Sequence, residues 1–167
     1  RYYGASATLA LVYRAFAKDN QSNSSVVIKH IGDSRVYHFS AMTKTWRCIT
    51  RDHNLLNQIV DEQAAAENRQ ADFGKYNQEG MASPLYALTD CLIADSDLDS
   101  NPMPAFDSQT LKVSSGDCLV VCTDGVHDLV LCDEWQGIDK HTNLQAWLKQ
   151  LRKQIYASEG RAYDNAT

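Results

Sequence analysis

The sequence lacks both a long apolar run and a concentration of positive charge. No apolar stretch approaches the ~18 residues of a membrane-spanning helix, and no secretory leader is recognisable at the start of the chain. The net charge is −5 at pH 7 and no Lys/Arg cluster is present, which is atypical of proteins that bind nucleic acid. We therefore expect a cytoplasmic protein that binds neither membrane nor nucleic acid.

Cysteine is also too sparse and too irregularly placed to indicate a disulfide framework. The chain has five cysteines, an odd number. Cys118 and Cys122 would lie roughly 13 Å apart on one strand, which is too far for a disulfide. We expect buried, reduced thiols.

What is present is the composition of an ordinary folded domain. The 167 residues are 44 % apolar and 22 % charged, as in a globular protein with a real core. No internal repeat and no linker-like boundary interrupts the chain. Residues 1–167 are therefore interpreted as a single domain.

Hydrophobic patterning predicts several strands mixed with amphipathic helices, which is typical of an α+β layered domain. Strands are expected at 26–31, 36–39, 46–49, 106–113 and 117–123, and helices at 54–69, after residue 125 and at 144–155. Residues 5–16 fit either a buried strand or a short helix. The strands on either side of Gly32-Asp33-Ser34-Arg35 are predicted to pair as a hairpin. Thr142 or Asn143 is a suitable N-cap for the last helix.

Four short polar motifs stand out. They are Gly32-Asp33-Ser34-Arg35, Thr50-Arg51-Asp52-His53, Thr123-Asp124-Gly125 and Asp164-Asn165-Ala166-Thr167. Each is weak alone, because Gly-Asp and Asp-Gly pairs are commonly only turns. Asp124 is better placed, since it follows the most apolar strand of the chain, and a rigidly held carboxylate suits Mg²⁺ or Mn²⁺.

Taken in order, the motifs resemble the PPM family, the protein phosphatase 2C type of metal-dependent Ser/Thr phosphatases. Gly4-Ala5-Ser6-Ala7-Thr8 and Ser115-Gly116-Asp117 fit the same order. The resemblance implies an α-β-β-α sandwich of two antiparallel sheets flanked by helices, incomplete at both ends. It also implies hydrolysis of phosphoserine and phosphothreonine in proteins by a metal-activated water.

The resemblance assigns metal ligation to aspartates. It implies that Asp124 and Asp164 supply carboxylates to a binuclear Mg²⁺ or Mn²⁺ centre, and that Asp52 contributes to a third ion. Gly125 and Asn165 stand beside two of these ligands. No catalytic residue beyond the metal ligands is expected in this chain.

Other polar residues of the motifs are interpreted as structural. Asp33 is expected to fix the hairpin, and Arg35 to pair with a nearby carboxylate. His53 is expected to orient the loop behind Asp52, and Asp128 to act as a helix-start carboxylate. His127 is not expected to be a ligand, because hard divalent ions in this chemistry prefer oxygen.

The resemblance extends to a substrate-shaping segment and to partners. Residues 54–83 fall where the family carries its variable flap beside the active site. The implied partners are phosphorylated protein substrates and a cognate Ser/Thr kinase system, with the protein acting as a monomer. No Cys-x₅-Arg phosphate loop is present, which disfavours a thiol-based mechanism.

One departure from the family pattern matters. The N-terminal Asp-Gly-His-Gly-Gly motif, whose Asp bridges both ions in the family, is absent from the sequence. The chain is then either part of a longer protein or a degenerate, non-catalytic relative that acts as a regulatory or binding module. We favour the first, because Asp52, Asp124 and Asp164 are all retained.

Overall fold

The computed structural model describes residues 5–15, 25–67, 84–94, 105–140, 143–158 and 167. The strands are β1 (Ala5–Ala7), β2 (Leu9–Ala15), β3 (Ser25–Ile31), β4 (Arg35–Ser40), β5 (Thr45–Cys48), β6 (Leu92–Ala94), β7 (Asp107–Lys112) and β8 (Cys118–Cys122). The helices are α1 (Leu55–Ala66), α2 (Asp124–His127) and α3 (Leu144–Ala157), with 3₁₀ turns η1 (Pro84–Tyr86), η2 (Cys132–Glu134) and η3 (Ile138–Lys140). No helix in the described residues is both long and apolar enough to cross a membrane.

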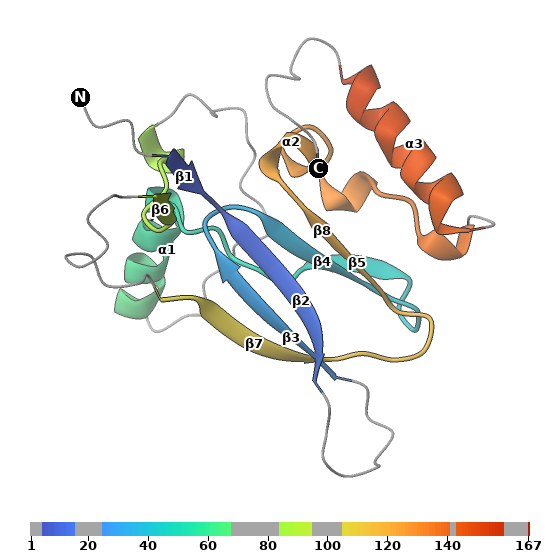
Figure 1. The fold of residues 1–167 in the computed structure, drawn as a ribbon, viewed down its shortest axis with the longest axis horizontal. Helices are drawn as coiled ribbons and strands as arrows, with labels where there is room; N and C mark the ends of the chain where they lie inside the picture. Colours follow the sequence, from blue (N-terminus) through green and yellow to red (C-terminus); the bar gives the residue numbers. More distant parts are fainter. Residues whose placement is uncertain (1–4, 16–24, 68–83, 95–104, 141–142, 159–166) are drawn as a thin grey trace.

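Two antiparallel three-stranded sheets form the body of the molecule (Figure 1). Their strand orders are β2-β3-β7 and β5-β4-β8, and a short β1-β6 pair lies apart from them. The two sheets contact each other through β2 and β8. The predicted α+β class with two antiparallel sheets is confirmed, and residues 5–15 adopt the strand alternative.

The strands on either side of the Gly32–Ser34 turn belong to different sheets, so the predicted hairpin is wrong. β3 pairs with β2 and β7, whereas β4 pairs with β5 and β8. The turn therefore carries the chain from one sheet to the other. Gly32 has φ +91°, and a Cβ there would lie 2.3 Å from Cγ2 of Thr8. Both features require glycine at this position.

A cluster of aromatic side chains holds α3 against the β5-β4-β8 sheet. The indole of Trp46 lies 5.2 Å, centroid to centroid, from those of both Trp135 and Trp147. Trp147 also donates from Nε1 to the carbonyl oxygen of Gln136 at 2.8 Å. Tyr37 and Val126 belong to the same buried cluster. This packing places α2, which starts directly after β8, on the same side of the sheet as α3 (Figure 1).

The local signals for the helices are largely confirmed. Asn54 caps α1 by accepting a hydrogen bond from the backbone of Asn57, and Asn143 caps α3 through the backbone N–H of Ala146. All five cysteines are free thiols. The expectation that they are buried is right for Cys122 and wrong for Cys48, which is exposed because β5 is an edge strand.

Candidate functional site

The Gly32–Ser34 turn is the point at which three of the polar motifs meet. His53 is bonded to Gly32 twice, because its backbone N–H donates to the Gly32 carbonyl at 2.9 Å and its Nδ1 lies 3.2 Å from the Gly32 N–H. On another side, Nε2 of His127 lies 3.1 Å from the carbonyl oxygen of Asp33. The turn thus joins the loop that carries Asp52 to the helix that begins with Asp124.

Asp52 is buried and held by an arginine fork. Nε and Nη2 of Arg35 donate to its two carboxylate oxygens at 2.8 and 2.5 Å, and Nη1 of Arg35 donates to the Tyr37 hydroxyl. Arg35 thus pairs with a carboxylate in this chain. Each carboxylate oxygen keeps a second lone pair, so this pairing leaves Asp52 able to share an oxygen with a cation.

Asp124 is the first residue of α2, at the end of β8. Its Oδ1 accepts a hydrogen bond from the Gly125 backbone at 2.8 Å, while among the described residues Oδ2 has no hydrogen-bond partner. Burial raises the pKa of Asp33, and the nearby charges of Asp124 and Asp52 raise it further. The charges of Asp124 and Asp52 thus both act on Asp33 at the turn, an arrangement that a divalent cation would relieve.

A second group of polar side chains lies behind the turn, between β3, β7 and the 50–53 motif. His30 and Asp107 are opposite each other in the β3-β7 register, and Nε2 of His53 lies 3.1 Å from Oδ2 of Asp107. The His30 and His53 rings are 4.9 Å apart. One ligating atom from each of these three residues falls within 4.8 Å of the others.

Hydrogen bonding argues that this trio is a structural brace and not a metal site. The Gly32 N–H can only donate, so Nδ1 of His53 must accept, and the ring proton of neutral His53 is then on Nε2, facing Asp107. That nitrogen has no lone pair for an ion. His30 is 1 % exposed, and in the part of the chain that the structure describes neither of its ring nitrogens has a hydrogen-bond partner. Burial, aided by His53, lowers the pKa of His30 to about 4.

Two acidic residues, Asp107 and Asp128, orient the histidines, a role that the sequence-based assignment gave to neither of them. Asp107 comes from β7, and only the strand register brings it to His53. Asp128 lies 2.9 Å from Nδ1 of His127. It is the C-cap of α2, so its expected place at a helix start is wrong, because α2 is only one turn long.

Of the last predicted ligand motif, Asp164–Thr167, the structure describes only Thr167. Asp164 and Asn165 lie outside the described residues. Thr167 does contact the site region: its carbonyl oxygen accepts from the Thr123 backbone at 3.3 Å, and its N–H donates to Thr123 Oγ1 at 3.2 Å. Thr167, the last residue of the motif, therefore lies beside the residue that precedes Asp124.

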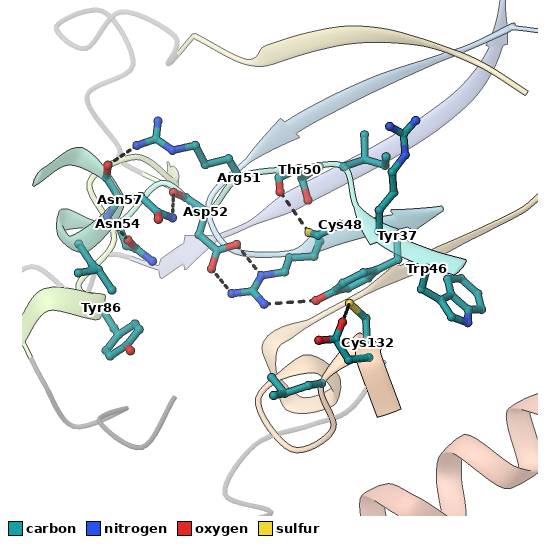
Figure 2. Close-up of a pocket in the computed structure, with 16 residues that line it drawn as sticks. Tyr37, Trp46, Cys48, Thr50, Arg51, Asp52, Asn54, Asn57, Tyr86 and Cys132 are labelled. Atoms are coloured by element: carbon teal, nitrogen blue, oxygen red, sulfur yellow. Dashed lines mark hydrogen bonds and ion pairs between the residues drawn. The ribbon is translucent and has the colours of Figure 1, made fainter. Parts of the chain in front are cut away.

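A cavity of about 540 Å³ opens beside Asp52 (Figure 2). Its wall includes the Arg35–Asp52 pair and Tyr37 from the sheet, and Asn54 and Asn57 from the start of α1. In Figure 2, Asp52 lies between the asparagines on one side and Tyr37 and Trp46 on the other. The cavity therefore adjoins a candidate ligand and is bounded on one side by the start of the 54–83 segment, at Asn54, Leu56 and Asn57.

Comparisons with known proteins agree with the fold. No family model matches the sequence and no curated protein sequence matches it. Among solved structures, the chain is similar to the Ser/Thr phosphatase Stp1 of Staphylococcus aureus, with 20 % identity and a TM-score of 0.64 over 98 % of this chain and 54 % of that one. It is also similar to the PPM Ser-Thr phosphatase MsPP of Mycobacterium smegmatis in complex with cacodylate, with 15 % identity and a TM-score of 0.54 over 86 % of this chain and 60 % of that one.

A third similar structure contains metal. The catalytic domain of the Ser/Thr phosphatase PstP in complex with two manganese ions shares 17 % identity, with a TM-score of 0.54 over 95 % of this chain and 56 % of that one. At these identities the likeness concerns the fold, and the chain spans little more than half the length of these neighbours. The resemblance drawn from the motifs is confirmed at that level: the chain has the fold of PPM-type Ser/Thr phosphatases.

Proposed function

We propose that this chain is part of a phosphatase domain that hydrolyses phosphoserine and phosphothreonine in proteins with Mg²⁺ or Mn²⁺ as cofactor. The observation that carries the proposal is that hydrogen bonds to the Gly32–Ser34 turn bring the segments of Asp52 and Asp124 together, on the fold of metal-dependent phosphatases. Their carboxylate oxygens are the hard donors that these ions prefer. When bound, such an ion lowers the pKa of water and offsets charge on a phosphoryl group, which is the chemistry of monoester hydrolysis.

In this proposal the chain's own residues hold and orient the site. Asp124 offers its unpaired Oδ2 from the start of α2, and Asp52 shares an oxygen while Arg35 keeps its carboxylate in place. Asp164 joins them as a ligand, which the contact between Thr167 and Thr123 supports. Asn165 and Gly125 follow these two ligands in the chain, and Asp33 keeps its structural place in the turn.

The remaining assignments follow from the same proposal. Residues 1–167 belong to one phosphatase domain, in which residues 54–83 shape the choice of phosphoprotein substrate. The cavity beside Asp52 supports that role, because the start of α1 forms part of its wall. The substrates are phosphorylated proteins, and their cognate kinase is a Ser/Thr kinase.

The test is a hydrolysis assay on the full-length gene product that contains this chain. We expect Mn²⁺-dependent hydrolysis of a phosphothreonine peptide, and a loss of at least about 100-fold in kcat/KM on Asp124→Asn, because a first ligand is removed. Asp139→Asn, which removes an exposed carboxylate near Lys44, is the matched control and keeps full activity. A protein that binds Mn²⁺ without any hydrolysis would instead be a non-catalytic binding module.

A further inference from the structure

Two histidines, His127 buried and His53 half-buried, approach the Gly32–Ser34 turn from different sides. His53 contacts Gly32, and His127 contacts Asp33. Each histidine follows a candidate ligand closely in the chain: His53 is next to Asp52, and His127 is three residues after Asp124. The two candidate ligands, which are 72 residues apart in sequence, are thus tied to adjacent peptide units.

The first connection is made by His53, whose imidazole has a polar partner at each of its two ring nitrogens. Nδ1 of His53 accepts from the Gly32 N–H at 3.2 Å, and Nε2 faces Oδ2 of Asp107 at 3.1 Å. The His53 backbone N–H adds a third bond, to the Gly32 carbonyl. The ring therefore has a fixed tautomer and a fixed plane, and Asp52 is one residue away from this anchored position.

The second connection differs in its hydrogen bonding, because both ring nitrogens of His127 face oxygen acceptors. Nε2 of His127 lies 3.1 Å from the Asp33 carbonyl oxygen, which can only accept, so this nitrogen is a donor. Asp128 faces the other ring nitrogen at 2.9 Å. His127 is 2 % exposed, and this burial excludes water as a competing partner for the ring. The contact fixes α2, and with it Asp124, against the turn.

Such anchoring has a physical purpose here. Carboxylates that converge repel one another, and a divalent-ion site requires them at defined separations before the ion arrives. Residues that orient ligands from behind commonly contribute 10–100-fold to metal affinity, as an order of magnitude. Neither histidine needs to touch the ion to have this effect.

We propose that His53 and His127 are positioning residues. Both bond to the Gly32–Ser34 turn, and this shared anchor sets the spacing of Asp52 and Asp124. Each is oriented by its own carboxylate, Asp107 for His53 and Asp128 for His127. The proposal rests on the proposed function in taking the two aspartates as divalent-metal ligands. It adds that the metal affinity of the site depends on two histidines that do not bind the metal.

At each histidine, a pair of variants separates the effect of the hydrogen bond on metal binding from the effect of the ring volume. In His53→Asn the side-chain oxygen can still accept from the Gly32 N–H, and in His127→Gln the side-chain amide can still donate to the Asp33 carbonyl. His53→Leu and His127→Leu keep bulk and lose those bonds. Leu151→Ala, which cuts a buried side chain of α3 outside the turn, serves as a control for general loss of stability.

The measurement is Mn²⁺ binding by titration calorimetry on the full-length gene product, with urea unfolding of each metal-free variant beside it. We expect each leucine variant to weaken Mn²⁺ binding by about tenfold or more, and the amide variants by less than about threefold. Leu151→Ala should unfold at lower urea and bind Mn²⁺ as the parent does. Equal Mn²⁺ affinity in the leucine and amide variants, or a loss that Leu151→Ala shares, overturns the proposal.

A metal-free readout separates this proposal from the proposed function. In the protein without metal, exchange of the Gly32 amide should be faster in His53→Leu than in His53→Asn, and the Asp33 carbonyl carbon resonance should move in His127→Leu but not in His127→Gln. Hydrolysis absent with these differences present contradicts the phosphatase assignment alone. Hydrolysis present with no difference between paired variants contradicts the anchoring alone.

Discussion

Arg35 and Asp52 show, for single residues, how much a buried charge depends on its partner. The side chains are 22 % and 7 % exposed, and the arginine fork meets both carboxylate oxygens. Arg35→Met should lower the free energy of unfolding by about 3 kcal/mol, because it leaves a buried carboxylate without its counter-charge. Urea unfolding of the metal-free protein measures this.

Two further variants test the reason for that loss. Arg35→Lys keeps the charge but cannot form the two parallel bonds, so its stability should fall between those of the parent and Arg35→Met. The double variant Arg35→Met/Asp52→Leu removes both charges and should recover most of the loss. If Arg35→Met alone is as stable as the parent, the pair is not the buried fork described above.

His30 gives the molecule a pH dependence whose direction follows from its burial. Its pKa is about 4 in the folded protein, against 6.5 for an ordinary histidine. Above pH 6.5 it is neutral in both states and contributes no difference. As pH falls from 6.5 toward 4, the unfolded chain takes up a proton that the folded protein does not, so stability falls, by about 3 kcal/mol in all.

The measurement is the urea midpoint at about pH 7.5 and about pH 4.5, for the parent and for His30→Leu. The leucine variant cannot take up the proton, so its midpoint should change less between the two pH values. His53, Asp52 and Asp107, whose charges act on His30, are present in both proteins, so the comparison isolates His30. An identical pH dependence in the two proteins would contradict the assignment.

The turn between β3 and β4 should tolerate substitution less well than the turn before β8. Gly32→Ala combines a positive φ with a Cβ placed 2.3 Å from Thr8. Gly116→Ala, in the turn before β8, has nearly the same φ of +89° but meets only the Ala41 Cβ at 3.1 Å. We expect about 1 kcal/mol of destabilisation at Gly116 from backbone strain and at least about 2 kcal/mol at Gly32, as the clash adds to it.

Urea unfolding of the two variants decides this, and the Gly116 variant serves as the matched control for strain alone. Gly32→Ala should also weaken Mn²⁺ binding, since the turn anchors both histidines, whereas Gly116→Ala should not. Equal losses of stability at the two glycines would show that Thr8 moves away from the new Cβ, and would contradict the tight packing of Thr8 against Gly32.

For the helices and strands, the starts of α1 and α3 could be predicted from the sequence, but the pairing of the strands could not. Asn54 and Asn143 were recognisable as helix starts because a cap acts within three residues. The strands beside Gly32 were also located, but their pairing was not, because two strands joined by a short turn usually pair with each other. Here the turn crosses between sheets, and that choice is made by strands distant in the sequence.

For the whole molecule, the order of the motifs was enough to indicate the fold, and the comparisons with solved phosphatases confirm it. Asp124 and Asp52 could be proposed as ligands from the sequence because each stands in a motif. Asp107 was not, because it reaches His53 only through the β3-β7 register. Residues that hold a site in place come from any part of the chain, so no short pattern marks them.

A metal ion should stabilise the whole molecule if the aspartates bind it. A ligand that binds only the folded state adds RT ln(1 + [L]/Kd), about 2.7 kcal/mol at a concentration of 100 times Kd, which corresponds to a rise of roughly 5–10 °C in Tm. We expect this rise on adding Mn²⁺ to the metal-free full-length gene product, and its reversal by a chelator. Asp124→Asn should remove most of this rise in Tm, while Asp139→Asn should keep it.

Without metal, the Asp124→Asn protein should have the same Tm as the parent or a higher one, because the substitution removes one of the carboxylates that raise the pKa of Asp33. A Tm that rises equally with Mn²⁺ in both variants would place the ion elsewhere in the molecule.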